Sequence, residues 1–199
     1  MIRSLFHRSR DRALSLSLST LARDVSRQHL TTLTPQKLLN LEQTFRMIDR
    51  KGVAGDVVEC GVGAGGSAAL LASLCVPERR FVGYDSFRDP PLDTVTATLR
   101  SFGIDLDGAR VALRHTHGDD APQLESGRRI ALLHINCEWP WGARCLDALG
   151  WRVVPGGAIV LDDRNEPSLC SAAVSRFLGR ERDFAAIPGK GSTVIGRNG

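Results

Sequence analysis

The feature that most constrains this chain is a glycine-rich turn between a predicted buried strand and a predicted helix. Val57 and Val58 indicate the strand, and an apolar helix follows the turn. Gly61, Gly63 and Gly66 lie in between. Glycine lets the backbone turn tightly and lie flat against a ligand, where a helix N-terminus offers free N–H groups. The pattern therefore predicts a cradle for a nucleotide-like ligand in an α/β fold.

Two ligands fit this turn. The spacing of its glycines matches the dinucleotide pattern, with Asp85 placed where a ribose-binding acid belongs. The same residues suit S-adenosylmethionine, and Glu59, just ahead of Gly61, distinguishes the two. A carboxylate there can face the ammonium and sulfonium groups of S-adenosylmethionine, whereas a pyrophosphate gains nothing from it. The methyl donor is the favoured interpretation, and a turn without a ligand is the alternative.

Length and composition favour one soluble domain. The chain has 199 residues, of which 42% are hydrophobic and 24% charged. We expect a basic N-terminal helix or flexible segment over 1–30 and a single domain over 31–199. A dehydrogenase needs a catalytic region beyond its cofactor half, and Tyr84, the only tyrosine, lies at the end of a predicted strand. A small nucleotide-binding oxidoreductase is therefore the less favoured reading.

Cysteine usage and charge indicate the compartment and the partners. Five cysteines without a Cys-x-x-Cys pair suit a reduced cytoplasm. No apolar run approaches the length of a membrane span. The net charge of +4 is spread along the chain, so nucleic acid is not indicated. Arginines among Leu and Ser near the start resemble a transit peptide or an interfacial helix, but a basic helix packed on the domain or on a second subunit is favoured.

The hydrophobic pattern predicts five strands that alternate with helices. Strands are expected at 56–60, 80–84, 111–115, 130–135 and 158–161. Helices are expected at 66–75, 92–102, 142–149 and 168–178, after an earlier one that starts at Thr34-Pro35 and ends at Gly52. The result is a doubly wound, mostly parallel sheet.

The sequence also predicts the structure of three connections. A short helical turn is expected after 118–120, and a turn is expected at 155–157. Residues 184–187 and 192–195 flank a Pro-Gly-Lys-Gly sequence and predict an antiparallel C-terminal hairpin. A parallel sheet closed by such a hairpin is the Rossmann-like fold of class I methyltransferases.

Polar residues follow the predicted strands where ligands collect in an open α/β sheet. These residues are Glu59, Asp85, Gly118, Asp119, Asn136, Glu138, Asp162 and Asp163. The two adjacent acids after the fifth strand, with oxygen donors after the fourth, predict a Mg²⁺ site that would help a hydroxyl lose its proton. The alternative is that Asp162 and Asp163 cap the last helix or pair with Arg144 or Arg164.

The chain resembles the macrocin O-methyltransferase family, metal-dependent enzymes that methylate sugar hydroxyls in antibiotic biosynthesis. The resemblance covers roughly residues 31–178. Its blocks are 32–56, 58–62 with Gly65 and Gly66, 82–87, 133–135, 155–163, and Cys170 with Ala173, Val174 and Phe177. It implies a homodimer in which the segment before Gly55 forms a lid or a dimer contact.

The resemblance also implies roles for individual residues. S-adenosylmethionine would be held by Glu59, Gly61, Gly63, Gly66, Asp85, Ser86, Gly118 and Asp119. Mg²⁺ would be held by Asn136, Asp162 and Asp163, and Asn136, Glu138 and Asp162 would form the catalytic centre. The family has Asp-x-Asp where this chain has Asn136 and Glu138, and an aromatic residue and a glycine where it has Arg164 and Asn165. An Asn can ligate a cation but cannot accept a proton, so the candidate bases are Glu138, His134 and His117.

The sequence and the resemblance together thus predict a cytoplasmic O-methyltransferase that uses S-adenosylmethionine, assisted by Mg²⁺, to methylate a hydroxyl of a sugar or another secondary metabolite. Trp139 and Trp141 lie where the acceptor should rest, and they either form a stacking wall or pack the following helix. The alternative function is a family member that binds the donor but has lost transfer, and acts as a binding or partner subunit. Asn136 motivates that alternative.

Overall fold

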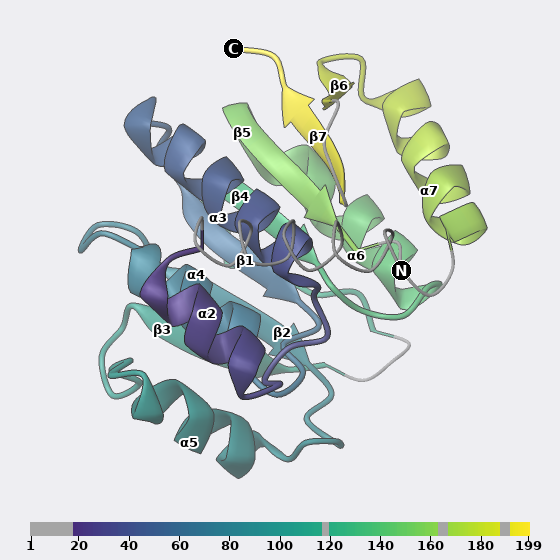
Figure 1. Ribbon diagram of the computed structural model, residues 1–199. Helices are drawn as coiled ribbons and strands as arrows, with labels where there is room; N and C mark the ends of the chain where they lie inside the picture. The colour runs from purple at the N-terminus through teal and green to yellow at the C-terminus, as the bar shows by residue number, and fades with distance from the viewer. Residues whose placement is uncertain (1–17, 117–119, 163–166, 188–191) are drawn as a thin grey trace, which may run out of the picture.

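The computed structural model describes residues 18–116, 120–162, 167–187 and 192–199, and these form one seven-stranded sheet (Figure 1). The strand order is β3-β2-β1-β4-β5-β7-β6. The strands are β1 Asp56–Cys60, β2 Phe81–Asp85, β3 Val111–His115, β4 Ile130–Ile135, β5 Val153–Leu161, β6 Phe184–Ile187 and β7 Thr193–Arg197. Strands β1 to β5 pair in parallel, and β7 is antiparallel to both β5 and β6. The predicted doubly wound sheet with a terminal hairpin is confirmed.

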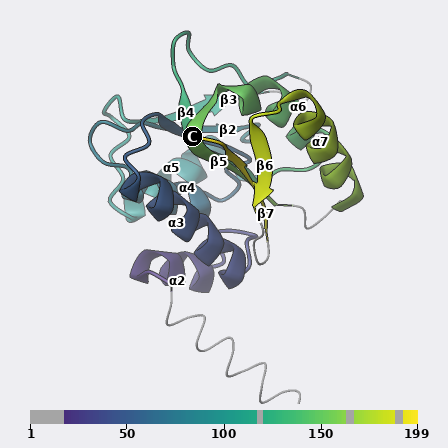
Figure 2. The same ribbon diagram turned by 90° about the horizontal axis from the view of Figure 1, so that it is seen from above.

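Helices cover both faces of this sheet (Figures 1 and 2). One apolar core lies under α2 Thr20–Arg27, α3 Pro35–Arg50, α4 Gly66–Leu74 and α5 Leu92–Ser101. The other lies under α6 Trp141–Leu149, which runs into the 3₁₀ turn Gly150–Arg152, and α7 Pro167–Arg180. Successive residues of β1 point to opposite faces, so that Val57 packs in the first core and Val58 in the second. This alternation explains why the central strands are apolar throughout.

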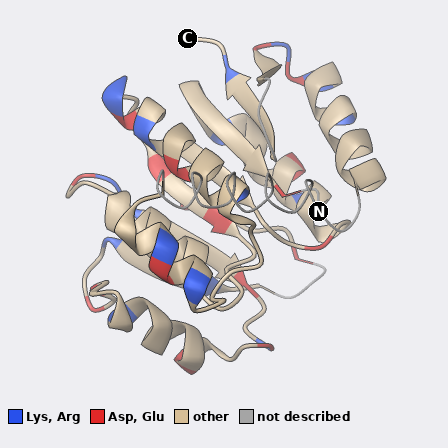
Figure 3. Ribbon diagram, viewed as in Figure 1, with Lys and Arg blue, Asp and Glu red and all other residues tan. Residues whose placement is uncertain are grey.

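Helices α2 and α3 each begin directly after a capping residue. The hydroxyl of Thr34 accepts a hydrogen bond from the Lys37 N–H at 3.4 Å, and Pro35 is the first helical residue of α3, as predicted. Ser19 caps α2 in the same way. Helix α2 lies within the predicted N-terminal segment, of which residues 1–17 lie outside the described residues. No helix among the described residues is long and apolar enough to cross a membrane. Lys and Arg positions are distributed over many elements (Figure 3).

Strand β5 begins earlier than the sequence indicated. Residues 155–157 lie inside β5, not in a turn before it, so the predicted turn is wrong. Val153 pairs with Ile130 and Ala158 pairs with Leu132, so the longer stretch of β5 bulges between two nearby residues of β4. The Pro-Gly-Gly sequence that indicated a turn therefore forms a bulge within a continuous strand.

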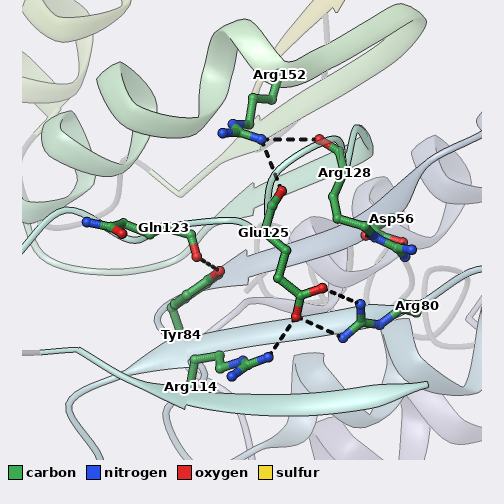
Figure 4. Close-up of polar contacts among 8 residues, drawn as sticks. All are labelled: Asp56, Arg80, Tyr84, Arg114, Gln123, Glu125, Arg128 and Arg152. Atoms are coloured by element: carbon green, nitrogen blue, oxygen red, sulfur yellow. Dashed lines mark hydrogen bonds and ion pairs between the residues drawn. The ribbon is translucent and has the colours of Figure 1, made fainter. Parts of the chain in front are cut away.

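The connection between β3 and β4 has no helix in its described part, residues 120–129, so the predicted helical turn is also wrong there. Instead, side chains fasten this connection to the sheet (Figure 4). The buried Tyr84 hydroxyl donates to the Gln123 carbonyl at 2.7 Å, and burial raises the pKa of Tyr84 to about 12. Glu125 receives hydrogen bonds from Arg80 and Arg114, each at 2.9 Å, and the Arg80 hydrogen bond lowers the pKa of Glu125.

Arginines fasten the end of the same connection (Figure 4). Arg152 donates to the carbonyls of Glu125 and Arg128, both at 3.3 Å. The guanidinium of Arg128 binds both carboxylate oxygens of Asp56, at the amino end of β1. Side-chain hydrogen bonds thus replace helix packing on this part of the sheet.

Candidate active site

A cavity of about 470 Å³ lies at the carboxyl ends of β1, β2 and β4. This is the edge at which ligands collect in an open α/β sheet. The residues that follow the strands and line the cavity are Gly61, Val62, Gly63, Ala64, Asp85, Ser86, Thr116, Asn136, Cys137 and Glu138. Six of the predicted site residues therefore meet in one place: Gly61, Gly63, Asp85, Ser86, Asn136 and Glu138.

The N-terminal segment forms a further wall of this cavity, through His29, Leu30, Thr31 and Thr32. The Leu30 carbonyl accepts a hydrogen bond from the Gly66 N–H at 2.9 Å. A Cβ atom at Gly66 would lie 2.5 Å from the Leu30 oxygen, so only glycine allows this approach. Gly66 thus acts by holding the wall, and it does not itself line the cavity. The resemblance placed a lid or dimer contact before Gly55 and includes Thr32 in its first block, but no motif singled out His29, Leu30 or Thr31.

The glycine-rich turn packs tightly on the loop after β4. Gly61 has a φ of +93°, and a Cβ atom there would lie 2.4 Å from the Asn136 carbonyl oxygen. The Gly63 N–H donates to Asp85 Oδ2 at 2.9 Å. The turn therefore brings the ends of β1, β2 and β4 into contact with each other.

Asp85 is held at the cavity by three donors. Besides the Gly63 N–H, its Oδ1 receives the Phe87 N–H at 3.1 Å and the Ser86 hydroxyl at 3.4 Å. The carboxylate is half-buried and lines the cavity. Such a fixed acceptor suits a ligand with hydroxyl groups, because little freedom is left to lose on binding.

Glu59 lies beneath the cavity and does not line it. Its side chain is fully buried, and Oε1 contacts His134 Nδ1 at 2.9 Å on the neighbouring strand. Among the described residues, Glu59 Oε2 and the buried Ser67 hydroxyl have no hydrogen-bond partner. His134 is 1% exposed, so its place as a candidate base is not supported, and it serves to hold Glu59.

Asp162 also lies outside the cavity lining. It is buried at the end of β5, and its carboxylate forms an ion pair with Lys37 in the first turn of α3. The two residues are far apart in the sequence, so no motif indicated this partner. The other expected members of this edge, Gly118, Asp119 and Asp163, lie outside the described residues, as do His117, Arg164 and Asn165.

The loop after β4 supplies the other polar residues. The Asn136 amide nitrogen donates to the Gly61 carbonyl at 3.4 Å, and the Glu138 side chain is exposed at the cavity. The two tryptophans that follow have different surroundings. Trp139 is buried in the core and packs α6, whereas Trp141 lines the cavity and donates from Nε1 to the Asp120 carbonyl at 3.2 Å. Asp89, which the sequence indicated only as part of a loop, also lines the cavity.

Three cysteines contact one another below the same loop. Cys60 ends β1, Cys137 follows β4 and lines the cavity, and Cys145 lies in α6. Burial raises the pKa values of Cys60 and Cys137. Burial also acts to raise the pKa of Cys145, but hydrogen bonds from the Cys137 and Cys60 thiols outweigh it and lower that pKa to about 5.

The described residues were also tested for a metal site. Within residues 18–116, 120–162, 167–187 and 192–199, no group of three or more His, Cys, Asp or Glu side chains is arranged to hold a metal ion. Asn136 lines the cavity, but Asp162 lies outside it and is paired with Lys37. Asp163, the third expected ligand, lies outside the described residues, so the magnesium site stays a prediction.

Comparison with known proteins bears on this arrangement. The model of the family described as macrocin-O-methyltransferase matches residues 5–97. No curated protein matches the chain. Among solved structures, the O-methyltransferase NovP superposes with a TM-score of 0.70 at 20% identity, over 83% of this chain and 81% of NovP.

Two further structures were solved with a ligand. TomG from Streptomyces achromogenes, an O-methyltransferase involved in tomaymycin synthesis and solved in complex with SAM, has a TM-score of 0.66 at 19% identity, over 92% of this chain and 91% of TomG. An O-methyltransferase from Bacillus cereus in complex with SAH has a TM-score of 0.64 at 15% identity, over 89% of this chain and 90% of that protein. These likenesses confirm the class I methyltransferase fold. Together with the family match over residues 5–97, they confirm the resemblance to the macrocin O-methyltransferases that the sequence indicated.

Proposed function

We propose that this chain uses S-adenosylmethionine to methylate a hydroxyl of a small molecule, such as a sugar or another secondary metabolite. The observation that carries the proposal is the Asp85 carboxylate, fixed at the cavity by the N–H groups of Gly63 and Phe87. Hydroxyl groups of a ribose are suitable donors to such a carboxylate. The SAM and SAH complexes of two structural neighbours support the choice of ligand.

Two buried oxygen atoms suit the amino-acid end of the donor. Leaving a buried polar atom without a partner costs about 1–3 kcal/mol. Glu59 Oε2 and the Ser67 hydroxyl are such atoms among the described residues, and both lie next to the glycine-rich turn. Neither atom lines the cavity, so we infer that Glu59 acts on the ligand ammonium as a buried negative charge beneath the cavity. Contacts from Gly118 and Asp119 stay predictions.

The cavity lining includes two exposed carboxylates, those of Glu138 and Asp89, and the aromatic ring of Trp141. We infer that these residues face the acceptor. S-adenosylmethionine supplies a methyl group activated by its sulfonium. We infer that Glu138 accepts the proton of the acceptor hydroxyl, because Asn136 cannot and His134 is buried against Glu59. Asn136 and Trp141 would orient the acceptor, and alignment of the reacting groups supplies much of the rate in such transfers.

Magnesium assistance stays a prediction of the resemblance. A dication at Asp162 would have to compete with Lys37 for the same carboxylate, and the described residues offer it no complete site. No step of the proposed transfer therefore depends on a metal. A homodimer in the cytoplasm likewise stays a prediction.

The test begins with donor binding. Calorimetry should detect binding of S-adenosylmethionine and SAH, weakened by Asp85→Asn and unaffected by NADH. Mass spectrometry of candidate acceptors should then detect the gain of one CH₂ unit. Binding of NADH with exclusion of S-adenosylmethionine would overturn the proposal.

A second candidate function follows from Asn136, which replaces a family aspartate. Donor binding without transfer to any hydroxyl acceptor, and without a response to Mg²⁺, would favour a binding or partner subunit that has lost the chemistry. Repeating the calorimetry with and without Mg²⁺ separates the two functions.

A further inference from the structure

A second cavity, of about 410 Å³, lies beside β2 and β3, and we call it the β2–β3 cavity. Val82 and Tyr84 of β2 line it, and both belong to the apolar core on the face of the sheet that carries α6 and α7. Its other lining residues are Arg80, Arg114, Gln123, Leu124, Glu125 and Ser126. Among the described residues, none lines both this cavity and that of the candidate active site.

Positive charge is in excess at the β2–β3 cavity (Figure 4). Arg80 and Arg114 share one carboxylate, because Glu125 Oε2 accepts from Arg80 and Glu125 Oε1 accepts from Arg114, each at 2.9 Å. The nearby Arg128 is held by a carboxylate of its own, that of Asp56. Arg80 Nε has no hydrogen-bond partner among the described residues. One carboxylate therefore neutralises only half of the charge of the two guanidinium groups that line the cavity.

Glu125 can be displaced from these arginines. Its side chain is 52% exposed, so its carboxylate can turn into water when another anion takes its place. Exposed ion pairs contribute little to stability, because water hydrates both partners well. The connection between β3 and β4 would still be held to the sheet by the hydrogen bond from Tyr84 to the Gln123 carbonyl.

We propose that the β2–β3 cavity binds the phosphate group of a small molecule through Arg80 and Arg114, with displacement of Glu125. The planar guanidinium group donates pairs of hydrogen bonds that match the spacing of phosphate oxygens. The cavity, at about 410 Å³, is in the size range of sites for small molecules. This binding site is separate from the donor cavity and does not depend on the proposed methyl transfer.

The tethered carboxylate of Glu125 decides which anion can bind. A free carboxylate would have to displace a group of the same chemistry that the chain itself holds at high effective concentration. A phosphate monoester has an advantage over Glu125, because it carries a charge of about −1.5 to −2 near neutral pH and three acceptor oxygens. The excess positive charge at the cavity is thus better matched by a phosphate group than by a carboxylate.

Calorimetry on the full chain tests this binding, with inorganic phosphate and methyl phosphate as ligands and chloride added to keep the ionic strength constant. We expect one saturable site for each, and at least tenfold weaker binding of acetate. An oligonucleotide without a terminal phosphate distinguishes a small phosphorylated molecule from a nucleic acid backbone. The absence of phosphate binding, or binding of acetate or of the oligonucleotide as strong as that of methyl phosphate, would overturn the proposal.

Variants of the three charged residues should change the affinity for methyl phosphate in opposite directions. Glu125→Gln removes the competing carboxylate and should strengthen binding by about three- to tenfold. Arg114→Gln and Arg80→Gln each remove a charged donor and should weaken binding by about tenfold. Arg114 is half exposed, so its replacement should leave the fold intact even if that of Arg80 does not.

Arg100→Gln is the matched control, because Arg100 is an exposed arginine of α5 and also forms an ion pair, with Asp107 at 3.3 Å. It should leave phosphate binding unchanged. Weaker binding in Glu125→Gln, unchanged binding in Arg114→Gln, or an equal loss in Arg100→Gln would each show that phosphate does not occupy this cavity. These titrations contain no methyl donor, so failure of the proposed methyl transfer and failure of this site are measured separately.

Discussion

Strand β1 has an acidic residue near each of its ends. Both residues are buried, but their carboxylates differ in their hydrogen-bond partners. At the amino end, both oxygens of Asp56 receive hydrogen bonds from Arg128. At the carboxyl end, Glu59 Oε1 contacts His134, and Oε2 has no partner among the described residues. A protein loses stability by leaving a buried carboxylate oxygen unpaired. The amino end of this strand is thus satisfied within the fold, and we propose that a ligand completes the carboxyl end.

The same contrast extends across the sheet. The buried side-chain oxygens without a partner in the described part of the chain belong to Glu59, Ser67 and Thr116, all at or just past the carboxyl ends of strands. In the connection between β3 and β4, by contrast, the Glu125 carboxylate accepts hydrogen bonds from Arg80 and Arg114 (Figure 4). The predictions below test this division.

The largest effect is expected at Asp162, which lies at the carboxyl edge but is already paired. Asp162→Ala leaves Lys37 buried without this carboxylate, and should lower the free energy of unfolding by about 3–5 kcal/mol. Urea denaturation measures the loss. The double variant Lys37→Met/Asp162→Leu should restore most of the stability, because both buried charges of the pair are then removed together. A loss below about 1 kcal/mol would show that the pair is not needed for folding.

The next effect concerns catalysis. Glu138→Gln removes the proposed proton acceptor and should reduce kcat by about 100-fold, within the range of general base catalysis. Donor affinity should stay the same, because this carboxylate lies on the acceptor side. Stopped assays with the acceptor found by mass spectrometry measure kcat. Calorimetry measures the affinity for the donor. An unchanged kcat would transfer the role of base to another residue.

A smaller effect should separate the two ends of β1 directly. Glu59→Gln keeps the shape of the side chain but removes its charge, and should weaken S-adenosylmethionine binding by about tenfold, as expected for one charged hydrogen bond. Asp56→Asn is the matched control on the same strand. It should reduce thermal stability and leave donor affinity unchanged. Equal effects of both variants on affinity would remove the division between the two ends.

The smallest effect is expected at Glu125, an exposed residue in the connection between β3 and β4. Glu125→Gln should lower Tm slightly and leave donor affinity unchanged. Because Arg80 lowers the pKa of Glu125 in the folded chain, its contribution is present at neutral pH and is lost as the pH falls and the carboxylate protonates. Tm measured against pH should therefore show the two chains converging in acid. A difference that grows in acid would contradict this origin.

Local signals in the sequence predicted most of the fold. The Thr34-Pro35 start of α3, the apolar strands and the glycine-rich turn each depend on neighbouring residues, and the structure confirms all of them. The turn predicted from the Pro-Gly-Gly sequence was wrong, because this stretch pairs with β4 and forms a bulge inside β5.

The site was predicted less completely, because its remaining parts are long-range contacts. Lys37 meets Asp162, Leu30 meets Gly66, and three cysteines meet from three elements. The hydrophobic periodicity of the sequence does not predict such contacts. Residues that follow strands, such as Asp85 and Asn136, were found because the sheet topology brings strand ends together.

The contact between Gly66 and the Leu30 carbonyl has a consequence for natural variation. Any side chain at position 66 would collide with that oxygen. The N-terminal wall can therefore pack here only because residue 66 is a glycine. A homologue with alanine or a larger residue there would have to detach this wall. It would then present a wider mouth, with room for bulkier acceptors.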